Sequence, residues 1–131
     1  MSAAYLLDTH VPVEIGVSGG FQVMPARVRR ILEDPQTELL LSVVSEVEIA
    51  IKNGIHKLAL SKDELSLICT NAGIASYPLR QRHTAQIFDL PMHHKDPFDR
   101  MIIATALSDG LPLISRDRRF RKYKGLRVIW L

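Results

Sequence analysis

Two aspartates follow apolar runs that are typical of buried strands. Asp8 follows residues 3–7, and Asp117 follows residues 112–115. The ligands of open α/β sheets bind beyond the carboxyl ends of their strands, so both carboxylates are expected along that edge. Either aspartate alone is more often a turn or helix-capping residue. The pair is therefore a candidate for chemistry only if other acidic residues join it.

Glu48 is predicted to lie on the inward face of a helix. At about 100° per residue, four apolar residues between positions 44 and 55 cluster on one side of the expected helix, and Glu48 falls inside that cluster. The cluster consists of Val44, Val47, Ile51 and Ile55. A buried glutamate is costly unless it is paired, hydrogen-bonded or bound to a metal. Lys52, one turn later, offers the simplest pairing partner.

Asp99 lies near the start of a second apolar helix, on the same predicted face as Ile102, Ile103 and Ala106. Alone, it could simply complement the helix dipole. Four carboxylates that converge on one edge repel one another unless a cation joins them. An all-oxygen donor set favours Mg²⁺ or Mn²⁺ over zinc. Such cations serve phosphoryl chemistry, because they orient water and stabilise negative charge on phosphate oxygens.

The elements that must position these acids alternate between strand and helix. The expected strands are 3–7, 38–42, 74–78, 112–115 and 126–130, and the expected helices are 26–34, 42–54, 61–73, 80–88 and 97–110. The strands are continuous apolar runs, which predicts an α/β fold with a parallel sheet covered on both faces. Segment 11–20 contains Pro12 and the glycine pair at 19–20, which predicts a shorter or looser element there.

The length and charge of the chain narrow the possible functions. Its 131 residues suit a single domain, and its formal net charge is +3 with a pI of about 9.2. Seven of the 17 Lys and Arg residues lie within segment 116–127. Such a cluster favours an anionic partner such as nucleic acid, although a solvated basic turn is the simpler interpretation.

The sequence predicts a cytoplasmic location. The longest stretch without a charged residue, 65–79, spans 15 residues, which is shorter than the roughly 18 apolar residues of a membrane helix. The first residues carry no basic segment of the kind that opens a signal peptide. The single cysteine, Cys69, cannot form an intrachain disulfide, which suits a reducing compartment.

The segments that carry the four acids resemble the motif series of PIN-domain nucleases, and most closely that of the VapC-like toxins of type II toxin–antitoxin pairs. The matching segments are LLDTH at 6–10, VEIAIK at 47–52, HHKDPFDRMIIATAL at 93–107 and LISRD at 113–117. The resemblance implies that residues 1–131 form a single PIN domain. Its fold would be a PIN-like three-layer α/β/α sandwich with a central, mainly parallel sheet of four to five strands.

The resemblance also implies an activity. The chain would be an endoribonuclease that uses Mg²⁺ or Mn²⁺ to hydrolyse RNA phosphodiester bonds, that a cognate antitoxin silences, and that forms a homodimer. Carried over by position, the catalytic and metal-binding quartet is Asp8, Glu48, Asp99 and Asp117. Asp8 and Asp99 correspond to direct metal ligands. Glu48 and Asp117 would complete the site or act through water.

Four more residues of these motifs are candidates for substrate binding. Thr9 and Ser115 match hydroxyl positions beside the site, where they would hydrogen-bond a carboxylate or a substrate phosphate. Arg100 and Arg116 are candidates for phosphate contacts, because guanidinium groups suit oxyanions. The alternatives are a surface ion pair for Arg100 and plain solvation for Arg116.

Other motif positions carry no assigned chemistry. Asp96 is interpreted first as a helix N-cap. His93 and His94 are interpreted as exposed loop histidines without a catalytic role. His56 stands where members of the family often have glycine.

Alternative functions differ in the residues that they require. A haloacid-dehalogenase-like phosphatase needs an aspartate at the position of His10, and a response-regulator receiver needs one at the end of the 74–78 strand. The remaining alternative is a PIN-fold module that binds RNA or a protein partner without cleaving RNA.

Overall fold

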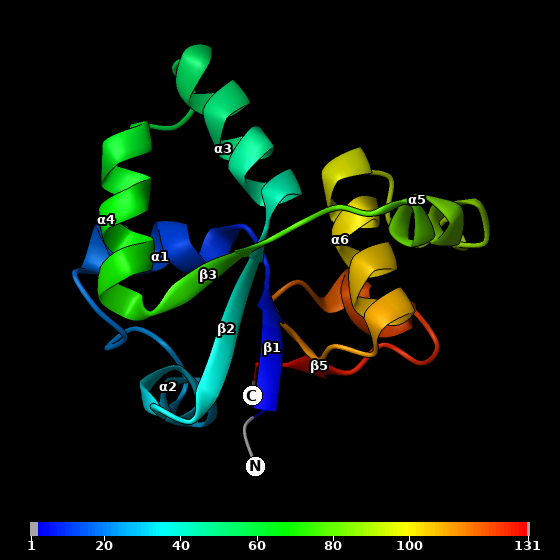
Figure 1. Cartoon of the computed structure of the whole chain (residues 1–131), viewed down its shortest axis with the longest axis horizontal. Coiled ribbons are helices and arrows are strands. Elements are labelled where there is room, and N and C mark those ends of the chain that lie inside the picture. Colours follow the sequence, from blue (N-terminus) through cyan, green and yellow to red (C-terminus); the bar gives the residue numbers. More distant parts are fainter. Residues whose placement is uncertain (1–2, 131) are drawn as a thin grey trace.

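A five-stranded parallel sheet forms the centre of the molecule. The computed structural model describes residues 3–130. The strands are β1 (Ala3–Leu7), β2 (Thr37–Ser42), β3 (Ile74–Tyr77), β4 (Leu113–Ile114) and β5 (Val128–Ile129), in the order β3-β2-β1-β4-β5 (Figure 1). The chain runs outward from β1 through β2 to β3, and then crosses to β4 on the other side of β1. The strand order therefore reverses between β1 and β4, which is where α/β sheets bind ligands.

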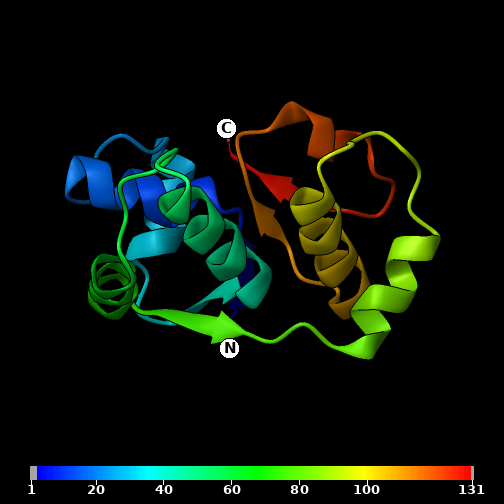
Figure 2. The same ribbon diagram turned by 90° about the horizontal axis from the view of Figure 1, so that it is seen from above.

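Helices cover both faces of this sheet. They are α1 (His10–Ser18), α2 (Ala26–Glu33), α3 (Val43–Gly54), α4 (Lys62–Ala72), α5 (Gln81–Phe88) and α6 (Pro97–Asp109), followed by the 3₁₀ helix η1 (Arg118–Lys122). Helices α1 and α4 lie on one side in Figure 2, and α5 and α6 lie on the other. The expected three-layer α/β/α sandwich is thereby confirmed. Among residues 3–130, no helix has both the length and the apolarity that a membrane crossing requires.

The continuous apolar strands are explained by two separate cores. Successive residues of a strand point to opposite faces, so Leu6 joins the core beneath α6 while Leu7 joins the core beneath α1, α2 and α4. Leu113 and Ile114 of β4 divide between the two cores in the same way. All four side chains have no exposed surface. Burial on both faces requires apolar residues at consecutive positions.

The expectation for segment 11–20 was wrong, because a regular helix, α1, forms there. Pro12 is the third residue of α1, where a backbone N–H has no acceptor within the helix, so the proline removes no helical hydrogen bond. Gly19 ends the helix in the left-handed region with φ of 77° and donates its N–H to the Ile15 carbonyl. The glycine pair therefore marks a helix end.

The inward face of α3 differs in part from the predicted one. Glu48 is buried as expected, yet Val47, Ile51 and Ile55 are 48–56% exposed. The buried face instead passes through Val44, Ser45, Glu48 and Ile49. The carboxyl-terminal half of α3 projects beyond the end of the sheet (Figure 1), so its apolar residues have no layer to pack against. Hydrophobicity alone could not identify a buried face that is partly polar.

Candidate active site

The four acidic residues of the quartet line one cleft at the carboxyl edge of the sheet. Asp8 follows β1, Asp117 precedes η1 after β4, Glu48 lies on α3 and Asp99 lies in the first turn of α6. The cleft has a volume of about 680 Å³. It is also lined by basic residues, namely His10, Lys52, Lys57, Arg116 and Arg118. Basic side chains therefore surround the four acidic residues in this cleft.

Asp8 is held by hydrogen bonds from both of its neighbouring segments. Its Oδ1 accepts the Thr9 backbone N–H at 2.7 Å, and its Oδ2 accepts the Ser115 hydroxyl at 2.6 Å. The His10 Nε2 lies 3.2 Å from the same Oδ2. The residue is only 4% exposed, so these contacts fix the orientation of a buried carboxylate.

Glu48 is also buried and also fully engaged. Its Oε2 accepts from Lys52 Nζ at 2.8 Å, which is the simple pairing that the sequence suggested. Its Oε1 accepts from the Thr9 hydroxyl at 2.9 Å, and that hydroxyl also contacts Ser45 Oγ at 2.8 Å. The ion pair with Glu48 raises the pKa of Lys52.

Asp117 is both a cap and an ion-pair partner. Its Oδ1 accepts the Arg119 backbone N–H at 3.0 Å, which begins η1, and the Arg119 guanidinium reaches both carboxylate oxygens. Partial burial opposes ionisation of Asp117, but the hydrogen bonds from Arg119 and His94 outweigh it and lower its pKa to about 2. Asp117 is therefore a carboxylate at neutral pH.

Asp99 is the least compensated acid of the quartet. Burial, followed by the charges of Asp8, Asp96, Glu48 and Asp117, raises its pKa to about 8. Glu48 and Asp117 each pair with a Lys or Arg side chain, and Asp8 accepts hydrogen bonds from Thr9 and Ser115. Asp99 has only the His94 imidazole beside its carboxyl group among the contacts of residues 3–130. A hard divalent cation fits this arrangement, because it would neutralise several carboxylates that otherwise disfavour one another's ionisation.

The interpretation of His94 as an exposed loop residue was wrong. It is 2% exposed, and its Nε2 lies 3.0 Å from Asp99 Oδ2 and 3.2 Å from Asp117 Oδ2. One ligand atom from each of these three residues falls within 4.8 Å of the others, which is a spacing that a metal site could have. His93 is exposed as expected, with its ring against Tyr123.

The other candidate residues differ in how they relate to the cleft. Thr9 and Ser115 direct their hydroxyls to Glu48 and Asp8, so the structure assigns both hydroxyls to carboxylates. Arg100 donates to three carbonyls of the loop between α5 and α6, at 3.0–3.3 Å, so a phosphate contact is not supported there. Arg116 lines the cleft, pairs with Glu14 and remains 58% exposed, so a phosphate contact stays compatible with its position.

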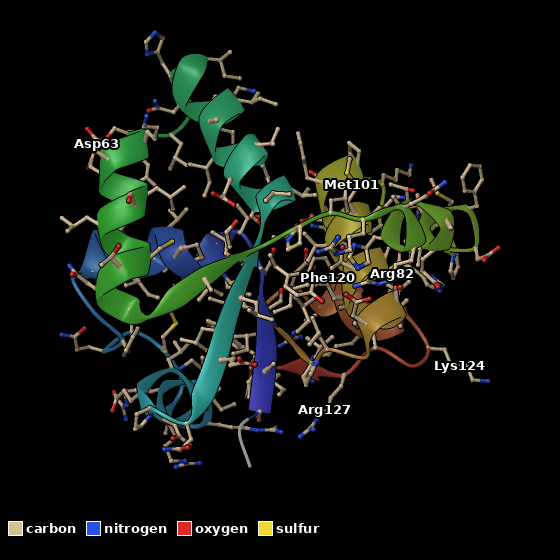
Figure 3. The ribbon with its side chains drawn as sticks, viewed as in Figure 1. Asp63, Arg82, Met101, Phe120, Lys124 and Arg127 are labelled. Carbon is tan, nitrogen blue, oxygen red and sulfur yellow. The ribbon has the colours of Figure 1, made fainter. Side chains whose placement is uncertain are left out.

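Several residues of the cleft were not identified from the sequence. His10 was considered only as a departure from a phosphatase motif, and Lys57 carried no signal at all. The basic run 116–127 does not form one patch. Arg116 and Arg118 line the cleft, whereas Lys124 projects from the side of the molecule and Arg127 lies near the opposite edge of the sheet (Figure 3).

The structure bears on two further motif positions, Asp96 and His56. Asp96 is the N-cap of α6, and its Oδ1 accepts the N–H groups of Phe98 and Asp99 at 2.8 and 3.1 Å. This cap aims the first turn of α6, and with it Asp99, toward the cleft. His56 has a φ of 59°, in the left-handed region that glycine adopts most readily, which explains the preference for glycine at this position of the resembled family.

Comparisons with known proteins agree with this architecture. The family model of the PIN domain matches residues 5–126. A search of curated proteins finds no match.

Similar solved structures extend over nearly the whole chain. VapBC2 from Rickettsia felis bound to a promoter DNA fragment has a TM-score of 0.71 at 14% identity, with coverage of 98% of this chain and 99% of that chain. DNA-bound VapBC from Salmonella typhimurium has a TM-score of 0.71 at 17% identity, covering 98% of both chains. VapBC-5 from Mycobacterium tuberculosis, from a family of toxin–antitoxin systems, has a TM-score of 0.62 at 21% identity, covering 98% and 99%. At these identities the likeness shows a shared fold.

Proposed function

The chain belongs to the PIN-domain family, and we propose that it is a metal-dependent endoribonuclease that acts as the toxin of a toxin–antitoxin pair. The observation that carries the proposal is the convergence of the carboxylates in one cleft at the point where the strand order reverses. The raised pKa of Asp99 supports it, because four acids at such close quarters are unfavourable without a cation.

Within this proposal, the quartet holds Mg²⁺ or Mn²⁺. Asp8 and Asp99 are the proposed direct ligands, and Glu48 and Asp117 complete the site or act through water. When bound, such a cation lowers the pKa of water and stabilises negative charge on the phosphate that is attacked. The carboxylate oxygens left free accept hydrogen bonds from the attacking water and orient it toward the phosphorus.

The remaining residues of the cleft keep these carboxylates in place and bind the substrate. Thr9 and Ser115 hold Glu48 and Asp8 through their hydroxyls. Lys57, Arg116 and Arg118 lie around the acids and offer positive charge to the phosphates that flank the cleaved bond. We propose RNA as the substrate because this arrangement suits a polyanion whose backbone passes over an acidic centre.

The proposed partner is a cognate antitoxin. The similar structures from Rickettsia felis, Salmonella typhimurium and Mycobacterium tuberculosis are VapBC proteins, and one is described as a toxin–antitoxin system. The motif resemblance adds a homodimer to the proposal. We also propose that residues 1–131 form a single PIN domain, and that it acts on RNA in the cytoplasm.

The direct test is cleavage of total cellular RNA by the purified full chain with Mg²⁺, with Mn²⁺ or with EDTA. The parent is expected to produce discrete fragments only with a metal, and Asp99→Asn is expected to produce none. Asp63→Asn is the matched control, because Asp63 lies on α4, away from α6 (Figure 3). It should cleave as the parent does.

Two results would contradict the proposal. Cleavage that persists in EDTA or in Asp99→Asn would remove the metal-site assignment. RNA binding without cleavage under all conditions would favour a non-catalytic PIN-fold module.

A further inference from the structure

His94 is fixed at the edge of the acidic site by contacts that lie outside the site. Its backbone N–H donates to the Tyr123 hydroxyl at 2.9 Å, and its carbonyl accepts from Arg100 at 3.3 Å. Its ring packs against Phe120, with ring centroids 5.3 Å apart. Only 2% of the residue is exposed. The fold therefore holds this imidazole in one orientation.

The orientation of the ring determines where its proton lies. The Asp96 backbone N–H donates to His94 Nδ1 across 3.2 Å. A backbone N–H can only donate, so Nδ1 must present its lone pair. The neutral imidazole has one N–H group, and its proton is therefore on Nε2.

The protonated nitrogen faces two carboxylates. Nε2 donates to Asp117 Oδ2 at 3.2 Å, and Asp99 Oδ2 lies 3.0 Å away. A donor between two acids offsets part of their repulsion and fixes the distance between them. Asp99 is the acid that otherwise has the weakest compensation. Removal of this donor should thus loosen the half of the site built from α6 and the segment after β4.

We propose that His94 is a positioning residue that donates its Nε2 proton to hold Asp117 beside Asp99, and that it is not itself a metal ligand. The inference rests on the proposed metal-dependent function. The spacing of His94, Asp99 and Asp117 alone would also permit a three-ligand site. To bind a metal through Nε2, however, His94 would need a lone pair on that nitrogen. Its proton would then lie on Nδ1, where it would face the Asp96 N–H and the hydrogen bond between them would be lost.

A second histidine in the same chain shows the same arrangement away from the cleft. The Arg80 N–H donates to His83 Nδ1 at 2.8 Å, and His83 Nε2 lies 2.7 Å from Asp109 Oδ2. His83 has no exposed surface, and its contact joins α5 to the end of α6. His83 thus provides a matched control, in which a histidine positions an aspartate without a role in metal binding.

The first test measures the tautomer of His94 directly. In long-range ¹H–¹⁵N correlation spectra of the metal-free full chain, His94 should carry its proton on Nε2. The proton should remain there when Mg²⁺ saturates the site. A proton on Nδ1, or loss of the Nε2 proton on addition of Mg²⁺, would overturn the proposal. This measurement needs no substitution, so a variant that fails to fold does not prevent it.

The second test measures Mn²⁺ affinity by electron paramagnetic resonance in folded variants. His94→Leu, which has no donor, should bind Mn²⁺ about tenfold or more weakly. His94→Gln, whose amide nitrogen can donate from the position of Nε2, should stay within about threefold of the parent. His83→Gln should leave the affinity unchanged. Parent-like binding by His94→Leu would contradict the proposed role.

The two proposals fail in distinguishable ways. If the parent itself binds no Mn²⁺, the proposed metal-dependent function is rejected. The tautomer then still tests the positioning role of His94. A proton on Nε2 supports donation to Asp117, and a proton on Nδ1 overturns it.

Discussion

Asp99→Asn is expected to stabilise the metal-free protein while it abolishes the activity. The substitution keeps the size of the side chain and removes a carboxyl group whose ionisation is opposed by burial and by the charges of Asp8, Glu48 and Asp117. The pKa of Asp99 is raised to about 8 from an ordinary 3.8. At pH 7 this difference corresponds to at most about 4 kcal/mol of lost folding free energy.

The expected gain is smaller than this limit. Because the buried asparagine amide must still lose its hydration, Asp99→Asn should be more stable than the parent by about 2 kcal/mol in free energy of unfolding. For a domain of this size that gain is roughly 6–10 °C in Tm.

The pH dependence of this effect has a definite sign. Between pH 4 and pH 8 the folded parent binds a proton at Asp99 that the unfolded chain does not, so the stability of the parent falls as pH rises through this window. The asparagine variant lacks this loss. The difference between the two proteins should therefore be small near pH 4 and largest at pH 8.

Urea unfolding in EDTA at pH 5 and pH 8, followed by circular dichroism, measures this difference. Saturating Mn²⁺ should stabilise the parent and leave the variant unchanged, because only the parent has the proposed site. A variant that is less stable than the parent in EDTA at pH 8, or a difference that does not change with pH, would refute the electrostatic reasoning.

Three further predictions concern other parts of the molecule. Asp109→Asn should lower the free energy of unfolding by about 2 kcal/mol, measured with urea at pH 7. The reason is that hydrogen bonds from Arg82, Tyr77 and His83 lower the pKa of Asp109. The contribution of ionised Asp109 to folding is present above about pH 4 and is lost as the pH falls further. An equal difference in stability between the parent and Asp109→Asn at pH 7 and pH 2 would contradict this reasoning. His56→Gly should raise stability by about 1 kcal/mol in the same assay, since glycine relieves a φ of 59°, and no gain would refute this. Arg118→Ala should weaken RNA binding and lower the slope of log affinity against log salt concentration by about 0.7. Lys124 projects from another side of the molecule (Figure 3), so Lys124→Ala should change neither quantity. Equal effects of the two substitutions would contradict the proposal that RNA binds along the cleft.

The sequence predicted a residue's position best where that position depends only on the helix or strand next to it in the chain. Asp8 comes directly after β1, and Asp96 and Pro97 begin α6, so local rules were sufficient for both. The parallel sheet was predictable because burial on both faces leaves a continuous apolar run. Strands β4 and β5 are only two residues long, and their limits depend on pairing with β1 and with each other, which no local pattern encodes.

Residues whose environment comes from distant segments were not predictable in this way. His94 is buried because Phe120 and Tyr123 of the η1 region, far along the chain, pack against it. The buried face of α3 is partly polar because it meets Thr9 and the cleft. A search for hydrophobic periodicity therefore selected Val47, Ile51 and Ile55, which are about half exposed. In both cases tertiary contacts decide the outcome.

The central claim is that the acidic cleft cleaves RNA with a bound cation. Its most direct test is to induce the parent chain and Asp99→Asn separately in bacteria without an antitoxin and to map new RNA 5′ ends across all cellular RNA. We predict discrete new ends with the parent and none with Asp99→Asn. The same new ends with both proteins, or growth arrest without new ends in either strain, would contradict the claim.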